Sequence, residues 1–203
     1  MTVSCGNSLN HSMASAVNML GDVHGGAGEQ CLEMIQKVQE LLDQGGRLEE
    51  SVSEEIANHR QTKGKYIPGF GHRFHKPEDP RAPRLMKLVS DAEGEKIVNG
   101  NFMRIGLEIQ RQLSQGKSTG IAMNIDGATA VIFGELGFAP PLARGLFCLS
   151  RSVGILAHAW EQKNQGGRNK GPTPPEFLWN YSGKNPLEDC LLYTSDAADD
   201  RVS

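Results

Sequence analysis

Apolar residues return at helical spacing through most of this chain, and this pattern constrains the fold more than any other feature. From Cys31 to Leu42, for example, apolar side chains recur every three or four residues and so share one face of a helix. Patterns of this kind, most of them bounded by glycine or proline, predict helices over 27–42, 48–59, 83–91, 101–113, 128–136 and 140–162. No segment alternates polar and apolar residues long enough to predict a sheet. The sequence therefore predicts an all-α fold.

Three segments rich in glycine or turn residues carry candidate chemistry. In the first, His24 is followed by two glycines and then by the first predicted helix, so we expect this histidine at a helix N-terminus. The positive end of the helix dipole disfavours a charged imidazole there, and a neutral ring can donate a hydrogen bond to a carbonyl oxygen. The alternative interpretation is that His24 only caps the helix.

The second segment is a tight loop that leads to His72 and then to Arg81. Pro68, Gly69 and Gly71 fix a backbone path that allows a ligand close to the main chain. Between His72 and Arg81 the loop carries three further side chains that can be positively charged: Arg73, His75 and Lys76. Such groups suit a carboxylate or a phosphate, so the loop predicts an anionic substrate. Alternatively, His72 only satisfies backbone groups beside the glycines.

In the third segment, Asp126 follows an apolar run, and Gly127 and Ala128 leave room beside it. A half-buried carboxylate is a stronger base than an exposed one. Taken alone, an aspartate beside a glycine is more often a turn or N-cap residue. The three segments together favour an acid/base site assembled from distant parts of the chain.

Other polar side chains fall in apolar surroundings. Arg151 lies in the apolar stretch of the last predicted helix and requires an anionic partner, either a structural carboxylate or a substrate. We interpret His11, His59 and His158 as core residues with satisfied hydrogen bonds.

Composition excludes several classes of protein. The chain of 203 residues, 38% of them apolar, can bury a core, and its net charge of −3 argues against general nucleic-acid binding. The four cysteines show no C-x-x-C spacing and are interpreted as reduced thiols of a cytoplasmic protein. His72 and His75 lack a third ligand nearby, so no metal is predicted. The longest apolar run, 142–160, is interrupted by charged residues and predicts no membrane span, and we expect no secretion signal.

Four motifs, in order and in approximate spacing, resemble the citrate synthase superfamily, which includes citryl-CoA lyases and the matching domain of ATP-citrate lyase. They are His-Gly-Gly from His24, Pro-Gly-Phe-Gly-His with Asp-Pro-Arg from Pro68 to Arg81, Asn-x-Asp from Asn124 to Asp126, and the run from Ser150 to Gln162. The resemblance covers about residues 18–183.

The resemblance implies a role for each matching residue. Asp126 is expected to take a proton from the acetyl methyl group of acetyl-CoA, while His24 stabilises the enol oxygen. His72 is expected to polarise the carbonyl group of oxaloacetate. Arg81 and Arg151 would hold the carboxylates of oxaloacetate. The expected contacts with coenzyme A come from Ile67, Gly69, Phe70, Lys76 and Asn124.

The resemblance also implies an assembly and a division into domains. Family members are homodimers, and Arg168 is our candidate for an arginine that reaches the substrate of the partner subunit, with Lys170 or a merely solvated loop as the alternatives. We expect a remnant of the large domain at 1–21, the small domain, which binds coenzyme A and is catalytic, at 22–137, and C-terminal helices of the large domain at 138–183. Residues 184–203 match nothing in the family, resemble translated sequencing-adapter sequence, and are expected to be a non-native or disordered tail.

Three functions follow from these features. The run from Gly166 to Pro175 resembles lyase-type members, which favours a citryl-CoA lyase that releases acetyl-CoA and oxaloacetate. A citrate or 2-methylcitrate synthase uses the same residues and is the second hypothesis. The third is a non-catalytic piece that binds coenzyme A or dimerises.

Overall fold

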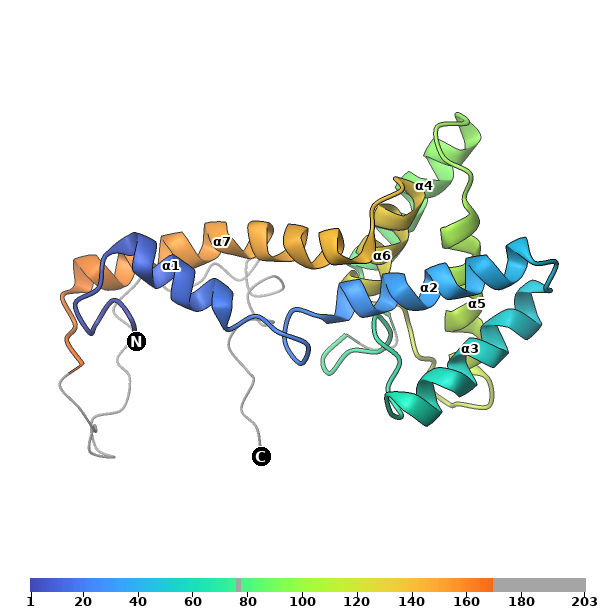
Figure 1. Cartoon of the computed structure of the whole chain (residues 1–203), viewed down its shortest axis with the longest axis horizontal. Coiled ribbons are helices and arrows are strands. Elements are labelled where there is room, and N and C mark those ends of the chain that lie inside the picture. The colour runs from blue at the N-terminus through green and yellow to red at the C-terminus, as the bar shows by residue number, and fades with distance from the viewer. Residues whose placement is uncertain (76–77, 170–203) are drawn as a thin grey trace. The chain divides into compact units, whose positions relative to one another are not determined.

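Seven helices and no strand form the part of the chain that the computed structural model describes, residues 1–75 and 78–169 (Figure 1). The helices are α1 (Leu9–Asn18), α2 (Ala27–Asp43), α3 (Leu48–Thr62), α4 (Arg81–Gly94), α5 (Asn101–Ser114), α6 (Ile125–Glu135) and α7 (Pro140–Gln165). The prediction of an all-α fold is confirmed.

Helix α2 is central to the core. It packs against α3, α5, α6 and α7, and its side chains Leu32, Ile35 and Val38 are fully buried. The facing side of α5 supplies Ile105 and Ile109, which are equally inaccessible. Full burial of one such side chain stabilises a fold by roughly 1.5–3 kcal/mol, so the apolar pattern seen in the sequence is what holds these helices together.

Helix α7 differs from α2 because many of its apolar side chains are exposed. It packs against α1 and the first part of α2 (Figure 1), yet only Ala143 and Ala159 are buried. Exposed apolar residues follow one another at helical spacing along it: Leu142, Leu149, Val153, Leu156 and Trp160. We call this set the α7 stripe. Contiguous apolar surface of this kind is typical of an interaction site.

The helix boundaries correct the sequence prediction at two places. Helix α1 was not predicted, although Ser8 precedes Leu9, Met13 and Val17 at helical spacing. Helix α6 begins at Ile125 and not at Ala128, because the side chain of Asn124 caps it.

The histidines predicted to lie in the core fall into two groups. His59 is buried, burial lowers its pKa, and its Nε2 lies 3.2 Å from the carbonyl oxygen of Tyr66. The prediction is wrong for His11 and His158, which are exposed on α1 and α7. Helical spacing alone had not distinguished their exposed positions from the buried face.

Two further predictions concern the division of the chain and the membrane. The domain boundaries at residues 21, 137 and 183 stay a prediction, and the tail at 184–203 lies outside the described residues. Among residues 1–75 and 78–169, no helix is both long and apolar enough to cross a membrane.

Candidate active site

The loop before His72 lies directly against the beginning of α6. The carbonyl oxygen of Gly69 accepts a hydrogen bond from the backbone N–H of Asn124 at 3.0 Å, and the N–H of Gly71 donates to Ala122 at 2.7 Å. The Asn124 side chain closes the junction, because its Nδ2 donates to the carbonyl oxygen of Gly71 at 2.8 Å. The loop of His72 and the helix of Asp126 are therefore joined through their backbones.

Glycine is required on both sides of this junction. Gly69 has φ +83°, and a β-carbon there would lie 2.6 Å from Sγ of Cys31 and 2.8 Å from Cα of Gly127. A β-carbon on Gly127 would in turn collide with the carbonyl oxygen of Gly69. Real β-carbons do not approach this closely, so the loop and α6 can touch only because both side chains are absent.

The ring of His72 is fixed in one tautomer by its own loop. Its Nδ1 accepts hydrogen bonds from the backbone N–H groups of Phe74, at 3.1 Å, and His75, at 3.0 Å. Because Nδ1 carries the lone pair, the proton of the neutral ring is on Nε2. The Nε2–H of the neutral ring is then a hydrogen-bond donor.

Asp126 lies in the first turn of α6 and is partly buried. Its backbone N–H donates to Oδ1 of Asn124 at 2.9 Å, which satisfies one of the free donors of the helix terminus. Its carboxylate also acts on Cys31 of α2: burial, and secondly the charge of Asp126, raise the pKa of that thiol. Asp126 thus shares its surroundings with α2 and the loop.

Asp79, which the sequence analysis did not single out, supports Arg81. It is 1% exposed and accepts hydrogen bonds from the backbone N–H and the Nε of Arg81, at 3.1 and 2.9 Å, and from its Nη2, also at 2.9 Å. Asp79 also accepts the N–H of Ile125 at 3.2 Å. Burial alone would raise its pKa, but the hydrogen bonds and charge of Arg81 outweigh it, and the pKa lies below its ordinary value.

His24 occupies a tight turn immediately before α2. The N–H of Gly21 donates to the carbonyl oxygen of His24 at 2.9 Å, and the side chain is exposed. The expected place at a helix N-terminus is nearly met, since α2 begins at Ala27. A β-carbon on Gly28 would lie 4.0 Å from the carbonyl oxygen of Asp126, so the beginnings of α2 and α6 approach each other.

Arg151 is partly buried on α7, and its guanidinium lies over the ring of Phe147 with 5.1 Å from Cζ to the centroid. Among residues 1–75 and 78–169 no acidic side chain pairs with it, so the structural carboxylate considered as its partner is not found in this part of the chain. Arg168 is exposed beyond the end of α7, and Lys76 and Lys170 lie outside the described residues.

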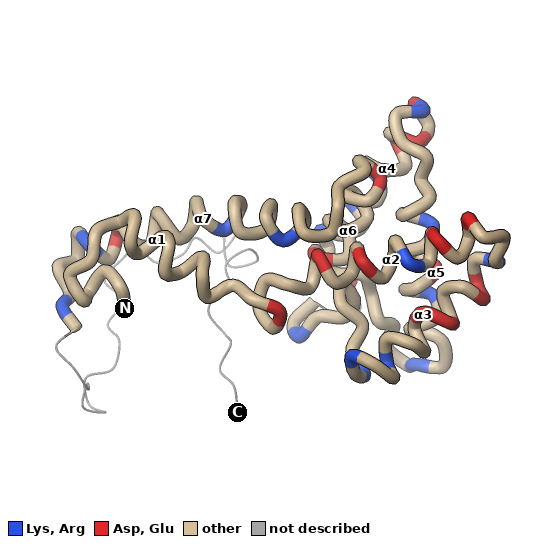
Figure 2. The backbone as a smooth tube through the Cα atoms, in the orientation of Figure 1, with Lys and Arg blue, Asp and Glu red and all other residues tan. Residues whose placement is uncertain are grey.

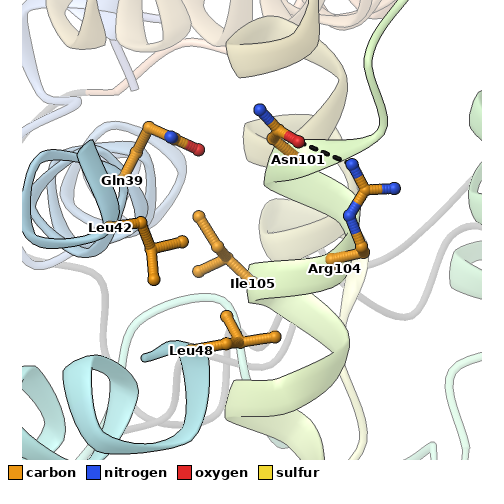
Figure 3. Close-up of a pocket in the computed structure, with 6 residues that line it drawn as sticks. All are labelled: Gln39, Leu42, Leu48, Asn101, Arg104 and Ile105. Carbon is orange, nitrogen blue, oxygen red and sulfur yellow. Dashed lines mark hydrogen bonds between the residues drawn. The ribbon is translucent and has the colours of Figure 1, made fainter. Parts of the chain in front are cut away.

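A separate cavity of about 270 Å³ is lined by none of the predicted site residues (Figure 3). It lies where the end of α2 meets the beginnings of α3 and α5, with Leu42, Leu48 and Ile105 as its apolar wall. Gln39 on α2 is twelve residues after Ala27, about 18 Å along the helix. This cavity is therefore remote from the turn of His24.

Comparison with known proteins identifies the family. Residues 1–172 match the family model described as citrate synthase, C-terminal domain. The chain belongs to the citrate synthase family. The citrate synthase of Acidithiobacillus ferridurans is 31% identical over 166 residues, which are 80% of this chain and 40% of that protein. The chain thus spans about 40% of the length of the curated relatives that it matches.

Solved structures support the same family and fold. The citryl-CoA lyase of Hydrogenobacter thermophilus is 33% identical, with a TM-score of 0.70, and the match covers 92% of this chain and 68% of that one. A citrate synthase from Thermoplasma acidophilum, solved in a ternary complex with carboxymethyl coenzyme A and oxaloacetate, is 20% identical with a TM-score of 0.58. That match covers 89% of this chain and 50% of that one. The predicted citrate synthase-like fold is confirmed.

Proposed function

We propose that this chain belongs to a citryl-CoA lyase, which cleaves citryl-CoA into acetyl-CoA and oxaloacetate. The observation that carries the proposal is the junction of the two motifs: a histidine held as the Nε2–H tautomer in a loop whose backbone is bonded to the helix that begins with Asp126. Similarity to the citryl-CoA lyase of H. thermophilus, at 33% identity, supports the direction of the reaction.

The first step of the synthetic direction needs a base and an opposing donor. Asp126 takes a proton from the methyl group of acetyl-CoA, and His24 donates a hydrogen bond to the enol oxygen that forms. One such donor stabilises a developing oxyanion by about 3 kcal/mol. In cleavage the carbinol hydroxyl loses its proton to water as its oxygen becomes the carbonyl oxygen of oxaloacetate. The bond between the acetyl carbon and the carbinol carbon breaks, its electron pair passes to the acetyl carbon, and protonated Asp126 returns a proton to that carbon.

His72 serves the other reactant. Its Nε2–H is the donor that polarises the carbonyl group of oxaloacetate, or holds the corresponding hydroxyl oxygen of citryl-CoA. The backbone N–H groups of Phe74 and His75, which donate to Nδ1, keep the ring from rotating and from exchanging its tautomer. A fixed donor needs no reorganisation during the reaction, which is why we assign this step to His72.

Positively charged groups around these residues suit the carboxylates of oxaloacetate. We propose that Arg81 and Arg151 bind them, since Asp79 orients the guanidinium of Arg81 and Phe147 supports that of Arg151. Coenzyme A is proposed to meet the loop at Ile67, Gly69 and Phe70, with Lys76 and Asn124 as further contacts. The T. acidophilum citrate synthase complex, with a coenzyme A derivative and oxaloacetate, supports this pair of ligands.

We also propose a homodimer, in which Arg168 reaches the substrate of the partner subunit. The α7 stripe supports association with a second copy, because its side chains Leu149 and Val153 are 67% and 74% exposed. Helix α7 also carries Arg151, so an interface here would lie close to residues of the proposed site.

A citrate or 2-methylcitrate synthase is the second candidate, favoured by the 31% identity to the A. ferridurans citrate synthase. It would use the same residues and then hydrolyse the thioester. Product analysis separates the two: incubation with citryl-CoA yields acetyl-CoA and oxaloacetate from a lyase, and citrate and free coenzyme A from a synthase.

A non-catalytic piece that binds coenzyme A is the third candidate, because the chain spans only about 40% of curated relatives. Calorimetric titration with coenzyme A, together with the exchange assay below, tests it. Binding without any exchange, also after the chain is joined to the N-terminal segment of a longer relative, would favour this candidate over both enzymes.

The decisive experiment measures loss of tritium from methyl-labelled acetyl-CoA in the presence of an oxaloacetate analogue. It uses the 203-residue chain and the same chain joined to the N-terminal segment of the H. thermophilus citryl-CoA lyase. We expect Asp126→Asn and His24→Ala each to lower the exchange rate about a hundredfold or more. Asp91→Asn is the matched control, because this exposed aspartate pairs with Lys87 on α4. Exchange that survives Asp126→Asn would remove Asp126 as the base.

A further inference from the structure

A side chain outside the predicted site fixes the turn that carries His24. Arg144, in the second turn of α7, donates from Nη2 to Oδ1 of Asp22 at 2.5 Å and from Nε to Oε2 of Glu29. Asp22 lies two residues before His24, and Glu29 lies in the first turn of α2. One guanidinium therefore connects the two sides of the turn to a helix more than a hundred residues away in sequence.

The turn also has hydrogen bonds of its own. Its own backbone closes with the hydrogen bond from Gly21 to His24, and Gln30 adds one from its side chain to the carbonyl oxygen of Asp22 at 3.1 Å. Arginine suits the bridging role, since its planar fork of donors can satisfy two carboxylates at once. A lysine ammonium in the same place is a point charge without that geometry.

The same face of α7 carries two further groups toward the site. Phe147 lies three residues after Arg144, and its ring is 3.1 Å from the position of a β-carbon on Gly25. Arg151 lies four residues further on and covers that ring. Basic residues recur along α7 in Figure 2. Arg144, Phe147 and Arg151 thus share the face of α7 that meets the His24 turn.

We propose that Arg144 is a positioning residue, which holds the His24 turn in register with α7 so that the His24 ring meets the enol oxygen. This inference rests on the proposed role of His24. Arg144 itself touches neither reactant in this assignment: it acts through Asp22 and Glu29.

The first test needs no activity and uses the 203-residue chain. Exchange of the Gly21 amide hydrogen, followed by NMR, reports closure of the turn, because this N–H is bonded to His24. We expect Arg144→Gln to accelerate it about tenfold and Arg144→Lys to have a smaller effect. Arg104→Gln is the matched control, since Arg104 pairs with Glu93 and lies on α5. Unchanged exchange at Gly21 in Arg144→Gln would overturn the inference.

The second test separates this inference from the proposed function. In the acetyl-CoA exchange assay with a version of the chain that is active, we expect Arg144→Gln to lower kcat about tenfold and to change KM less than about twofold. In a His24→Ala background, Arg144→Gln should cause no further loss. If His24→Ala is fully active, the proposed function fails. If His24→Ala is inactive in the expected way but Arg144→Gln leaves kcat unchanged in the wild-type background, only the role of Arg144 fails.

Discussion

The loop of His72 and the turn of His24 are held in place by different kinds of contact. The loop is bonded to α6 from backbone to backbone, through Gly69, Gly71 and Asn124. The turn is tied to α7 by a guanidinium and two carboxylates, one of which, on Asp22, is 77% exposed. Backbone contacts survive most substitutions and are insensitive to salt, whereas exposed ion pairs depend on single side chains and are screened. We therefore expect the loop of His72 to be the rigid half of the site and the turn of His24 to be its adjustable half.

The largest effect on stability is expected at a glycine of the rigid half, where any side chain would collide with the facing backbone. Gly127→Ala places a β-carbon against the carbonyl oxygen of Gly69, and backbone on both sides prevents easy relaxation. We expect a loss of about 3 kcal/mol in the free energy of unfolding, measured with urea. Gly145→Ala is the control: nothing lies within 4 Å of that position in α7, so alanine should stabilise by up to about 1 kcal/mol. Equal stabilities of the two variants would show that the junction is loose.

Asp79→Asn tests the second support of the rigid half. It removes the charge behind Arg81 and weakens the bond to Ile125, for an expected loss of about 2 kcal/mol at neutral pH. The folded pKa of Asp79 lies below the ordinary 3.8, so the stability it contributes is complete above that pH and is lost as the pH falls through the folded pKa. Urea titrations between neutral and acid pH should show a smaller decline in Asp79→Asn than in the wild type. Equal declines in the free energy of unfolding of the two proteins would contradict the lowered pKa of Asp79 as a source of stability.

In the adjustable half, the two arms of Arg144 should differ. Glu29 is 15% exposed, and Glu29→Gln is expected to cost about 1 kcal/mol of unfolding free energy. Asp22→Asn should cost only about 0.3 kcal/mol, because solvent screens the exposed pair. At about 1 M salt, where the Debye length is about 3 Å, the cost of Asp22→Asn should disappear while most of that of Glu29→Gln remains. A larger cost for Asp22→Asn than for Glu29→Gln would show that the stronger contact of Arg144 is the one with Asp22 in the turn.

The α7 stripe should affect stability least of all. Val153→Glu replaces an exposed side chain and should change the unfolding free energy by less than about 0.5 kcal/mol. Its expected effect is on association: sedimentation should show a concentration-dependent assembly of the wild-type chain, which the glutamate suppresses by placing charge in the apolar contact. A monomeric wild-type chain would argue against the proposed homodimer.

The sequence predicted the rigid half better than the adjustable half. Glycines and prolines act locally, so the loop before His72 was recognisable from its own residues, and so were most helix ends. The predicted beginning of α6 was wrong, although Asn124 is a residue type that favours the N-cap position and indicates a helix start at this point.

The contacts of Arg144 could not be predicted in the same way. Its partners, Asp22 and Glu29, are far away in sequence, and their approach depends on how α2 packs on α7. The one available signal was a charged residue within the apolar pattern of the last helix. Asp79 was likewise not predicted as a site residue, and only the fold shows that it is buried beneath Arg81.

Cys31 gives the protein a built-in reporter of the junction. The thiol is fully buried beside Gly69, and burial together with the charge of Asp126 raises its pKa, so it stays protonated and unreactive toward alkylating reagents at neutral pH. Cys5 is exposed and is modified without any opening. Alkylation of Cys31 therefore requires that α2 and the loop separate, and its time course measures how often they do. A ligand that bridges the loop and α6 lowers the rate of Cys31 alkylation in proportion to the fraction of the protein that it occupies.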